Sequence, residues 1–181
     1  RDYYASRGLG DVYKRQMVAS LTTGKKKYAD VESEIQQLLK STDALHEKLL
    51  DQVRADAEGF QPLSRAYAIP REDPTRAAVL QSAAETACTA PLEIMALCAA
   101  ALSAAGRLAE IGSRLAVSDA GCAAAILRGA LEAAALNVLV NTKTMTDRSA
   151  ADHLNARCFA LLDQGRTDGE RIFCAVRDQL V

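Results

Sequence analysis

The stretch that decides the fold runs from Ser118 to Met145 and reads SDAGCAAAILRGALEAAALNVLVNTKTM. It contains no proline and is dense in alanine and leucine, which both have high helix propensity. The stretch therefore predicts one long helix of roughly seven to eight turns. Ser118 or Asp119 stands where a side chain is expected to cap the start of this helix.

The polar residues of this predicted helix recur on one side of it. Asp119 and Asn137 are 18 residues apart, so at about 100° per residue they share an azimuth, and Asn141 lies about 40° further round. Buried carboxylates and amides cost free energy unless they find partners. We interpret the stripe as a close-packed helix face that also supplies polar groups. Its remaining members are Ala123, Ile126, Ala130 and Ala134.

Length and composition predict a single globular domain. The chain has 181 residues, of which 49% are hydrophobic and 25% charged, which is typical of a folded domain with a sizeable core. A net charge of −1 gives no reason to expect nucleic acid or a membrane surface as a partner. We also expect no membrane span, because charged residues interrupt the alanine-rich segments: Glu85, Glu93, Arg128 and Glu132.

Cysteine usage favours a cytoplasmic protein with reduced thiols. The five cysteines are widely spaced, and none forms a CxxC pair. This spacing argues against a zinc site and against a disulfide framework. The residues concerned are Cys88, Cys98, Cys122, Cys158 and Cys174.

The beginning of the chain differs from the rest. Residues 1–16, RDYYASRGLGDVYKRQ, show no helical or strand period, and we interpret them as a non-native leader before a helical domain at 17–181. The apolar run 17–21 is typical of the end of a helix whose beginning is missing. Gly24 is a natural C-cap for that helix. The lysine run 25–27 is most simply a solvated turn, and the alternative is an anion site.

A second long helical pattern extends from about Ala29 to Ile69, with apolar residues at three- and four-residue steps. Asp56 falls between Val53 and Phe60 in this apolar seam. It is either a local irregularity or ion-pair partner, or a carboxylate with a shifted pKa that acts in acid/base chemistry.

Proline and glycine mark the remaining boundaries. A turn at 70–74 precedes a segment from Thr75 to about Ile111, which Pro91 makes either one kinked helix or two. After Asp147 we expect a last amphipathic helix with a break at 165–169. Strand-type alternation is absent from the sequence. The predicted fold is therefore all-α, a bundle of long, roughly antiparallel helices with a truncated first helix.

The sequence lacks the common catalytic motifs. It contains no phosphate loop, no dinucleotide fingerprint and no GxSxG. His46 and His153 are solitary and do not have metal-ligand spacing, so we expect no metal site. Chemistry would rest on carboxylates, amides, hydroxyls and lysines, which suits proton transfer on a reactive small molecule.

Five blocks of sequence follow one another along the chain: MVASLTTGKKKYADVESEI, ADAEGF with AYAIP, AAETACTAPLEI, AVSDAGCAAAILRGAL and AALNVLVNTKTMTD. Their order and spacing are those of the formiminotransferase-cyclodeaminase family, and the chain resembles the cyclodeaminase part of that family over nearly all of residues 17–147. It is similar to the stand-alone methenyltetrahydrofolate cyclohydrolases and formimidoyltetrahydrofolate cyclodeaminases. The resemblance implies an all-helical homodimer that binds a tetrahydrofolate derivative in a polar cleft, without metal, nucleotide or tightly bound cofactor.

The resemblance implies one of two reactions. They are ring closure of 5-formiminotetrahydrofolate to the 5,10-methenyl form with loss of ammonia, and hydrolysis of the 5,10-methenyl form to 10-formyltetrahydrofolate. Asp56 matches the acidic position of the family's DAxxF block and is expected to transfer the proton. Asn137 and Asn141 match its NVxxN block and are expected to orient the pterin or the reacting carbon.

The other matching positions are expected to bind parts of the substrate that lie away from the reacting carbon. Lys25 and Lys26 match the GKKKY block and would receive folate glutamate carboxylates. Ser118 and Asp119 match the VSD block and either bind ligand or cap the helix. Asp119 lies about 27 Å along the helix from Asn137, so one ligand in one subunit is not expected to reach both, whereas a dimer could bring the two ends together.

Three hypotheses follow. The first is a cytoplasmic folate one-carbon enzyme, a lyase or a hydrolase. The second is an inactive folate-binding or assembly module with the same fold, which the resemblance raises because family members usually begin with a PxPGGGS-type segment where this chain has residues 1–16. The third is a purely structural bundle whose small-residue stripe is a dimer seam.

Overall fold

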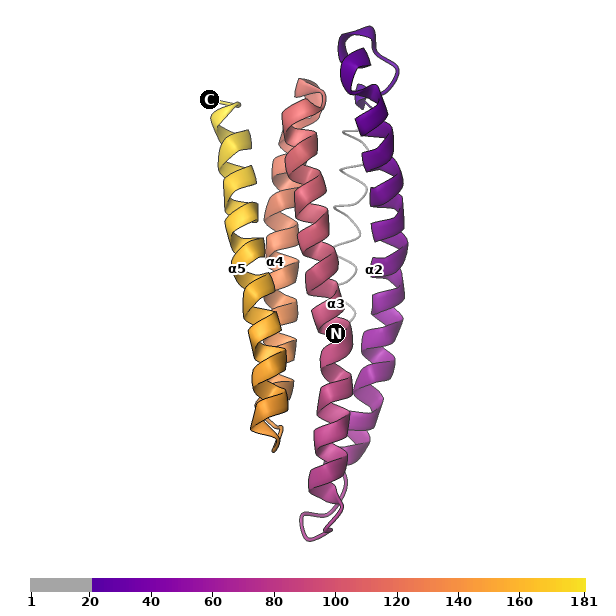
Figure 1. The fold of residues 1–181 in the computed structure, drawn as a ribbon, viewed down its shortest axis with the longest axis vertical. Helices are drawn as coiled ribbons and strands as arrows, with labels where there is room; N and C mark the ends of the chain where they lie inside the picture. Colours follow the sequence, from indigo (N-terminus) through magenta and orange to yellow (C-terminus); the bar gives the residue numbers. More distant parts are fainter. Residues whose placement is uncertain (1–20) are drawn as a thin grey trace.

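The computed structural model describes residues 21–181, in which four long helices lie along one axis (Figure 1). They are α2 (Glu32–Tyr67), α3 (Arg76–Ile111), α4 (Val117–Thr142) and α5 (Arg148–Asp178). Successive helices run antiparallel, and α3 packs against each of the other three. The predicted all-helical bundle is confirmed. Two short 3₁₀ helices complete the described chain: η1 (Lys26–Val31) before α2 and η2 (Arg114–Ala116) before α4.

The predicted leader at residues 1–16 and the truncated first helix lie outside the described residues. Just inside them, Gly24 has φ +74°, the left-handed conformation expected of a helix C-cap. The hydroxyl of Thr22 accepts a hydrogen bond of 2.8 Å from the backbone N–H of Ser113. This bond ties the start of the described chain to the link between α3 and α4.

The start of α4 corrects one expectation. Neither Ser118 nor Asp119 caps the helix, because the N-cap is Ala116 and no side chain there accepts a capping hydrogen bond. The 3₁₀ helix η2 leads directly into α4, so both residues already lie in its first turn. Asp119 there still interacts favourably with the helix dipole.

The expected break in the last helix is also wrong, because α5 is continuous through Gly165 and Gly169. Both glycines are buried and face α4. A Cβ at Gly169 would lie 2.9 Å from the Cβ of Arg128, and one at Gly165 would overlap Leu131. These glycines are therefore places where two helices approach closely, which sequence alone does not distinguish from helix breakers.

Pro91 lies inside one helix, since α3 is continuous from Arg76 to Ile111. Much of α3 is buried alanine, so its neighbours approach closely on several sides. The main core lies between α3, α4 and α5. Its largest fully buried side chains include Leu92, Met95, Leu102, Leu127, Leu131 and Ile172.

Two apolar segments correct our expectation that charged residues interrupt every possible membrane span. By length and composition, Arg76–Ile111 and Arg114–Thr142 are both apolar enough to cross a membrane. In the first, 72% of the apolar window is buried within the bundle, as in the core helix of a soluble protein. In the second only 44% is buried, because one face of α4 lies at the surface.

Gly169→Ala tests the close approach of α4 and α5. Overpacking against the Arg128 Cβ should cost about 1–3 kcal/mol, which exceeds the roughly 1 kcal/mol that alanine gains over glycine in a helix. Urea unfolding should therefore show a lower midpoint. Gly59→Ala is the matched control: its Cβ would lie 3.6 Å from the Thr86 carbonyl oxygen, an ordinary contact, and stability should hold or rise. An unchanged or higher midpoint for Gly169→Ala would contradict this packing.

Candidate functional site

Asp56 is half-buried on α2, close to the level of Thr89 on α3. The position follows from the packing of Gly59, where a Cβ would lie 3.6 Å from the carbonyl oxygen of Thr86. The helices α2 and α3 are antiparallel, so a step back along α2 corresponds to a step forward along α3. Asp56 lies three residues before Gly59 and is therefore at the level of Thr89, three residues after Thr86.

Asn137, on α4, lies at the same level. The thiol of Cys88 donates a long hydrogen bond of 3.8 Å to the carbonyl oxygen of Val138. This bond places Val138 at the level of Cys88. Because α3 and α4 are antiparallel, Asn137, one residue before Val138, lies within about 1.5 Å of the level of Thr89, one residue after Cys88. The structure thus brings the half-buried Asp56 and Asn137 to one height, on two helices that flank α3.

Asn141 is 4% exposed, and its side chain has a structural partner. The amide Nδ2 donates a hydrogen bond of 3.1 Å to the carbonyl oxygen of Ala87. That carbonyl would normally accept from the N–H four residues later, but the residue there is Pro91, which has no N–H. Asn141 therefore satisfies the acceptor that the proline leaves without its helical partner, and fixes α4 to α3 one turn from Asn137. Its expected role in orienting the substrate stays a prediction.

Cys88 lies beside this contact and is fully buried. Burial raises the pKa of its thiol to about 11, and a hydrogen bond from Asn141 opposes part of that rise. The group is therefore a neutral thiol at physiological pH. Since the thiolate is the nucleophilic form, Cys88 is poorly suited to covalent catalysis.

The other predicted binding residues lie at the far end of the bundle, where α2 and α4 begin and α5 ends (Figure 1). Ser118 is exposed and Asp119 half-buried in the first turn of α4, about 27 Å along the helix from Asn137. Lys25 and Lys26 are exposed just before and within η1. A single chain thus divides the seven predicted residues between two places.

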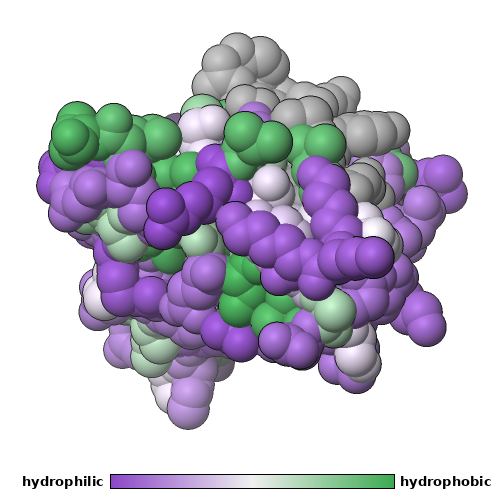
Figure 2. All heavy atoms as spheres, turned by 90° about the horizontal axis from the view of Figure 1, so that it is seen from above, coloured by the Kyte–Doolittle hydropathy of each residue, from purple (hydrophilic) through white to green (hydrophobic). Residues whose placement is uncertain are grey.

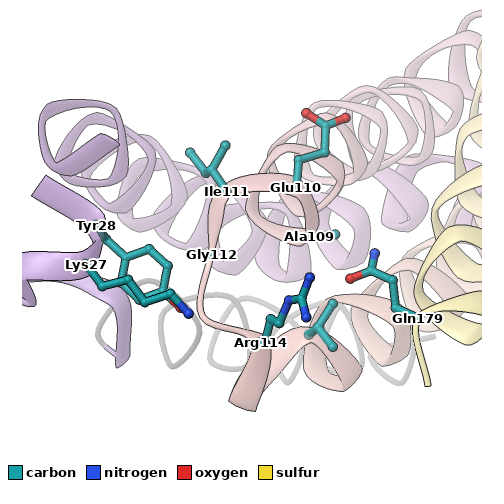
Figure 3. A pocket seen from close by; sticks show the side chains of 9 residues that line it. Lys27, Tyr28, Ala109, Glu110, Ile111, Gly112, Arg114 and Gln179 are labelled. Carbon is teal, nitrogen blue, oxygen red and sulfur yellow. The ribbon is translucent and has the colours of Figure 1, made fainter. Parts of the chain in front are cut away.

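A cavity of about 340 Å³ opens at that far end, and Figure 3 shows its lining. Lys27 enters from η1, and Arg114 from the link after α3. The Lys27 ammonium lies 5.6 Å from the ring centroid of Tyr28. Glu110 also lines the cavity, but its carboxylate is paired with Arg107 at 2.8 Å. Two cations beside an aromatic ring make this a candidate anion site.

Sequence reasoning missed this pair of residues. It selected Lys25 and Lys26, whereas the third lysine of the run, Lys27, lines the cavity. The lysine run 25–27 was the only feature of the sequence that indicated Lys27 as a candidate anion-binding residue. No sequence pattern connects it with Arg114, because the two come together only when the ends of three helices meet. Seen from this end, hydrophilic side chains cover most of the surface, with apolar ones showing between them (Figure 2).

The sequence profile of the formiminotransferase-cyclodeaminase family matches residues 15–160 of this chain. The chain belongs to this family. The match spans α2, α3, α4 and the first part of α5, and so contains both groups of candidate site residues.

Two curated relatives carry different activities. The chain is 35% identical over 168 residues to a methenyltetrahydrofolate cyclohydrolase of Methylorubrum extorquens, covering 91% of this chain and 81% of the relative. It is 30% identical over 155 residues to the formimidoyltransferase-cyclodeaminase of Sus scrofa, covering 83% of this chain but 29% of that longer protein.

A solved structure has the same fold. It is the crystal structure of a formiminotetrahydrofolate cyclodeaminase from Thermotoga maritima, with a TM-score of 0.91 and 23% identity, covering 99% of this chain and 88% of that one. That protein thus has the same arrangement of long helices as this chain.

The hydrogen bond between Asn141 and Ala87 generates a testable prediction. Asn141→Ala should lower the free energy of unfolding by about 1–3 kcal/mol, because a buried carbonyl loses its partner. In a Pro91→Ala background the backbone N–H at position 91 can serve that carbonyl, so the cost should fall clearly. A double-mutant cycle in urea measures the difference. Equal costs in both backgrounds would show that Asn141 does not compensate for the proline.

Proposed function

We propose that this chain is an enzyme of folate one-carbon metabolism whose reaction is centred on Asp56 and Asn137. The observation that carries the proposal is the common level of this carboxylate and this amide on two helices that flank α3. Its support from relatives is the 35% identity to a methenyltetrahydrofolate cyclohydrolase over most of both chains.

The hydrolytic reaction requires three proton transfers. Water adds to the carbon between N5 and N10 of 5,10-methenyltetrahydrofolate and loses a proton, which gives a tetrahedral carbon that carries a hydroxyl. The bond from that carbon to N5 then breaks, N5 takes up a proton, and the hydroxyl gives its proton to solvent as the formyl group forms on N10. A single carboxylate can serve the first two transfers by accepting the water proton and returning it to N5. Asp56 is the group that we assign to these steps.

The cyclodeaminase reaction uses the same groups. N10 attacks the formimino carbon carried by N5 and gives up its proton, which leaves a tetrahedral carbon that carries an amino group. This amino group is protonated and leaves as ammonia, and the 5,10-methenyl ring remains. The carboxylic acid form of Asp56 would protonate the leaving nitrogen. In both reactions the amide of Asn137 would hold the pterin or the reacting carbon in line. The chain would be a hydrolase in the first case and a lyase in the second.

Anion binding completes the proposed site. The carboxylates of the folate glutamate tail would bind to the cationic end of the bundle, where Lys25 and Lys26 are exposed and where Lys27 and Arg114 line the cavity. Ser118 and Asp119 would contribute further polar groups. We also propose that the protein is a cytoplasmic homodimer whose ligand is the folate, with no nucleic acid, membrane or tightly bound cofactor needed.

Absorbance in the methenyltetrahydrofolate band tests the reaction. Purified protein should either remove the methenyl compound in one cuvette or form it from the 5-formimino compound in another. Loss of the methenyl band would identify the hydrolytic reaction, and its appearance would identify the cyclodeaminase reaction. Asp56→Asn should lower turnover by about 10²-fold or more, the usual contribution of a general acid/base. Asp51→Asn, an exposed aspartate on the same helix, should leave turnover unchanged.

Two outcomes would contradict the proposal. Full turnover by Asp56→Asn would remove Asp56 from the mechanism. Silence of the folded wild-type protein in both cuvettes would indicate the inactive folate-binding or assembly module, and a rise in melting temperature with a folate analogue would then show that binding persists.

A further inference from the structure

The turn that joins α4 to α5, residues 143–147, lies at the opposite end of the bundle from the anion cavity (Figure 1). A side chain of α3, Gln81, holds this turn. Its amide oxygen Oε1 accepts hydrogen bonds from the backbone N–H groups of Thr146, at 2.8 Å, and Asp147, at 3.0 Å. The hydroxyl of Thr146 donates to the same oxygen at 3.3 Å. One side-chain oxygen thus ties two successive backbone groups of the turn to α3.

The nitrogen of the same amide is also engaged. Nε2 of Gln81 donates a hydrogen bond of 2.6 Å to the carboxylate of Glu85, one turn further along α3. A carboxylate only accepts hydrogen bonds, so Glu85 fixes which end of the amide faces the turn. Gln81 is half-buried and Glu85 exposed. The pair therefore presents an acceptor in one fixed orientation to the residues that begin α5.

The turn also carries Met145 into the contact between α2 and α3. Met145 is 4% exposed and belongs to a buried cluster of side chains from α2, α3 and α5. Phe60, one turn after Asp56 on α2, packs against this cluster. The turn is therefore seated against the part of α2 that directly follows Asp56. The other buried members of the cluster are Leu63, Ala66, Ala83, Ala84, Ala87 and Ala151.

Hydrogen bonds within this segment join it to the end of α4. The guanidinium of Arg148 donates to the carbonyl oxygens of Thr142, at 3.1 Å, and Met145, at 3.3 Å. The hydroxyl of Thr144 donates a bond of 2.8 Å to the carbonyl oxygen of Asn141. A displacement of the turn would therefore be transmitted to the last residues of α4.

The position of the turn matters for the candidate site because α2 and α4 both pack against α3. Asp56 lies on α2 and Asn137 on α4, so the space between them depends on how each helix is held on α3. The bond from Asn141 to Ala87 sets the height of α4. The seat of Met145 sets how the end of α4 lies relative to α2.

We infer that Gln81 is a positioning residue for the proposed reaction. It does not reach the reacting atoms, because its level on α3 is eight residues, about 12 Å, from that of Thr89. It holds the turn, the turn seats Met145 beside α2, and Asn137 thereby keeps its place relative to Asp56. The inference rests on the proposed function, from which the roles of these last two residues are taken.

Kinetics on a matched set of variants tests this role. Gln81→Met removes the acceptor and keeps the length of the side chain. Its kcat should fall about 10-fold with KM within about twofold, since a small misplacement of an orienting group costs rate more than affinity. The double variant Gln81→Glu, Glu85→Gln exchanges the two groups and preserves net charge and both hydrogen bonds, so kcat should return to near wild type. A wild-type kcat for Gln81→Met, or no rescue by the exchange, would overturn the inference.

Ile35→Val controls for a simple loss of stability. Ile35 is fully buried with Leu108 and Ala116 near the other end of the bundle. Removing one methylene group there should lower the urea midpoint without affecting the turn, so kcat of the folded protein should be unchanged. An equal loss of kcat in Ile35→Val and Gln81→Met would attribute the effect to stability and would also overturn the inference.

Amide hydrogen exchange tests the coupling without any assay of activity. In Gln81→Met, exchange should become faster across residues 139–147, which include the last turn of α4, and the exchanged pair should restore slow exchange. Faster exchange at Thr146 and Asp147 alone would show that Gln81 only supports the start of α5, and the inference would be wrong. A wild type inactive in both cuvettes is a distinct result: it contradicts the proposed function, whereas the exchange data still show whether Gln81 holds the end of α4.

Discussion

The close antiparallel contact between α4 and α5 sets the register on which the rest of the structure depends. Glycine is repeatedly the contact residue: Gly121 meets Val176, and Gly165 meets Leu131. Because a glycine has no side chain, each contact specifies one position along the partner helix, and a shift of one residue would drive a side chain into backbone. The hydrogen bond of 2.7 Å from the hydroxyl of Thr142 to the amide oxygen of Asn155 is consistent with the same alignment of α4 and α5. With α5 fixed in this way, α4 presents its polar stripe on one side and its exposed apolar face on another.

The contact of α4 with α3 depends on an acceptor that a proline creates. Pro91 deprives the Ala87 carbonyl of its helical donor, and the amide of Asn141 supplies one. The contact lies in a buried region, where an unpaired carbonyl would cost free energy, so the two helices are held at this height. Asn137 is one turn away, so the same contact sets its level along α3, whereas the level of Asp56 follows from the packing of Gly59 against Thr86. The proline in α3 therefore positions the part of the candidate site that lies on α4.

Much of this fold could be predicted from the sequence. Helical periodicity and the absence of strand alternation were sufficient for the bundle, and Gly24 was recognisable as a helix end. The errors came from residues whose roles depend on distant partners. Gly165 and Gly169 were interpreted as a break, because a glycine that admits another helix has the same local pattern as one that ends a helix.

The candidate site was predictable by residue type but not by arrangement. Asp56 was singled out because a carboxylate in an apolar seam is unusual, and the structure places it level with Asn137. That level depends on the register of three helices, which no local pattern contains. Arg114 was missed for the same reason, since it joins Lys27 only where the ends of the helices meet.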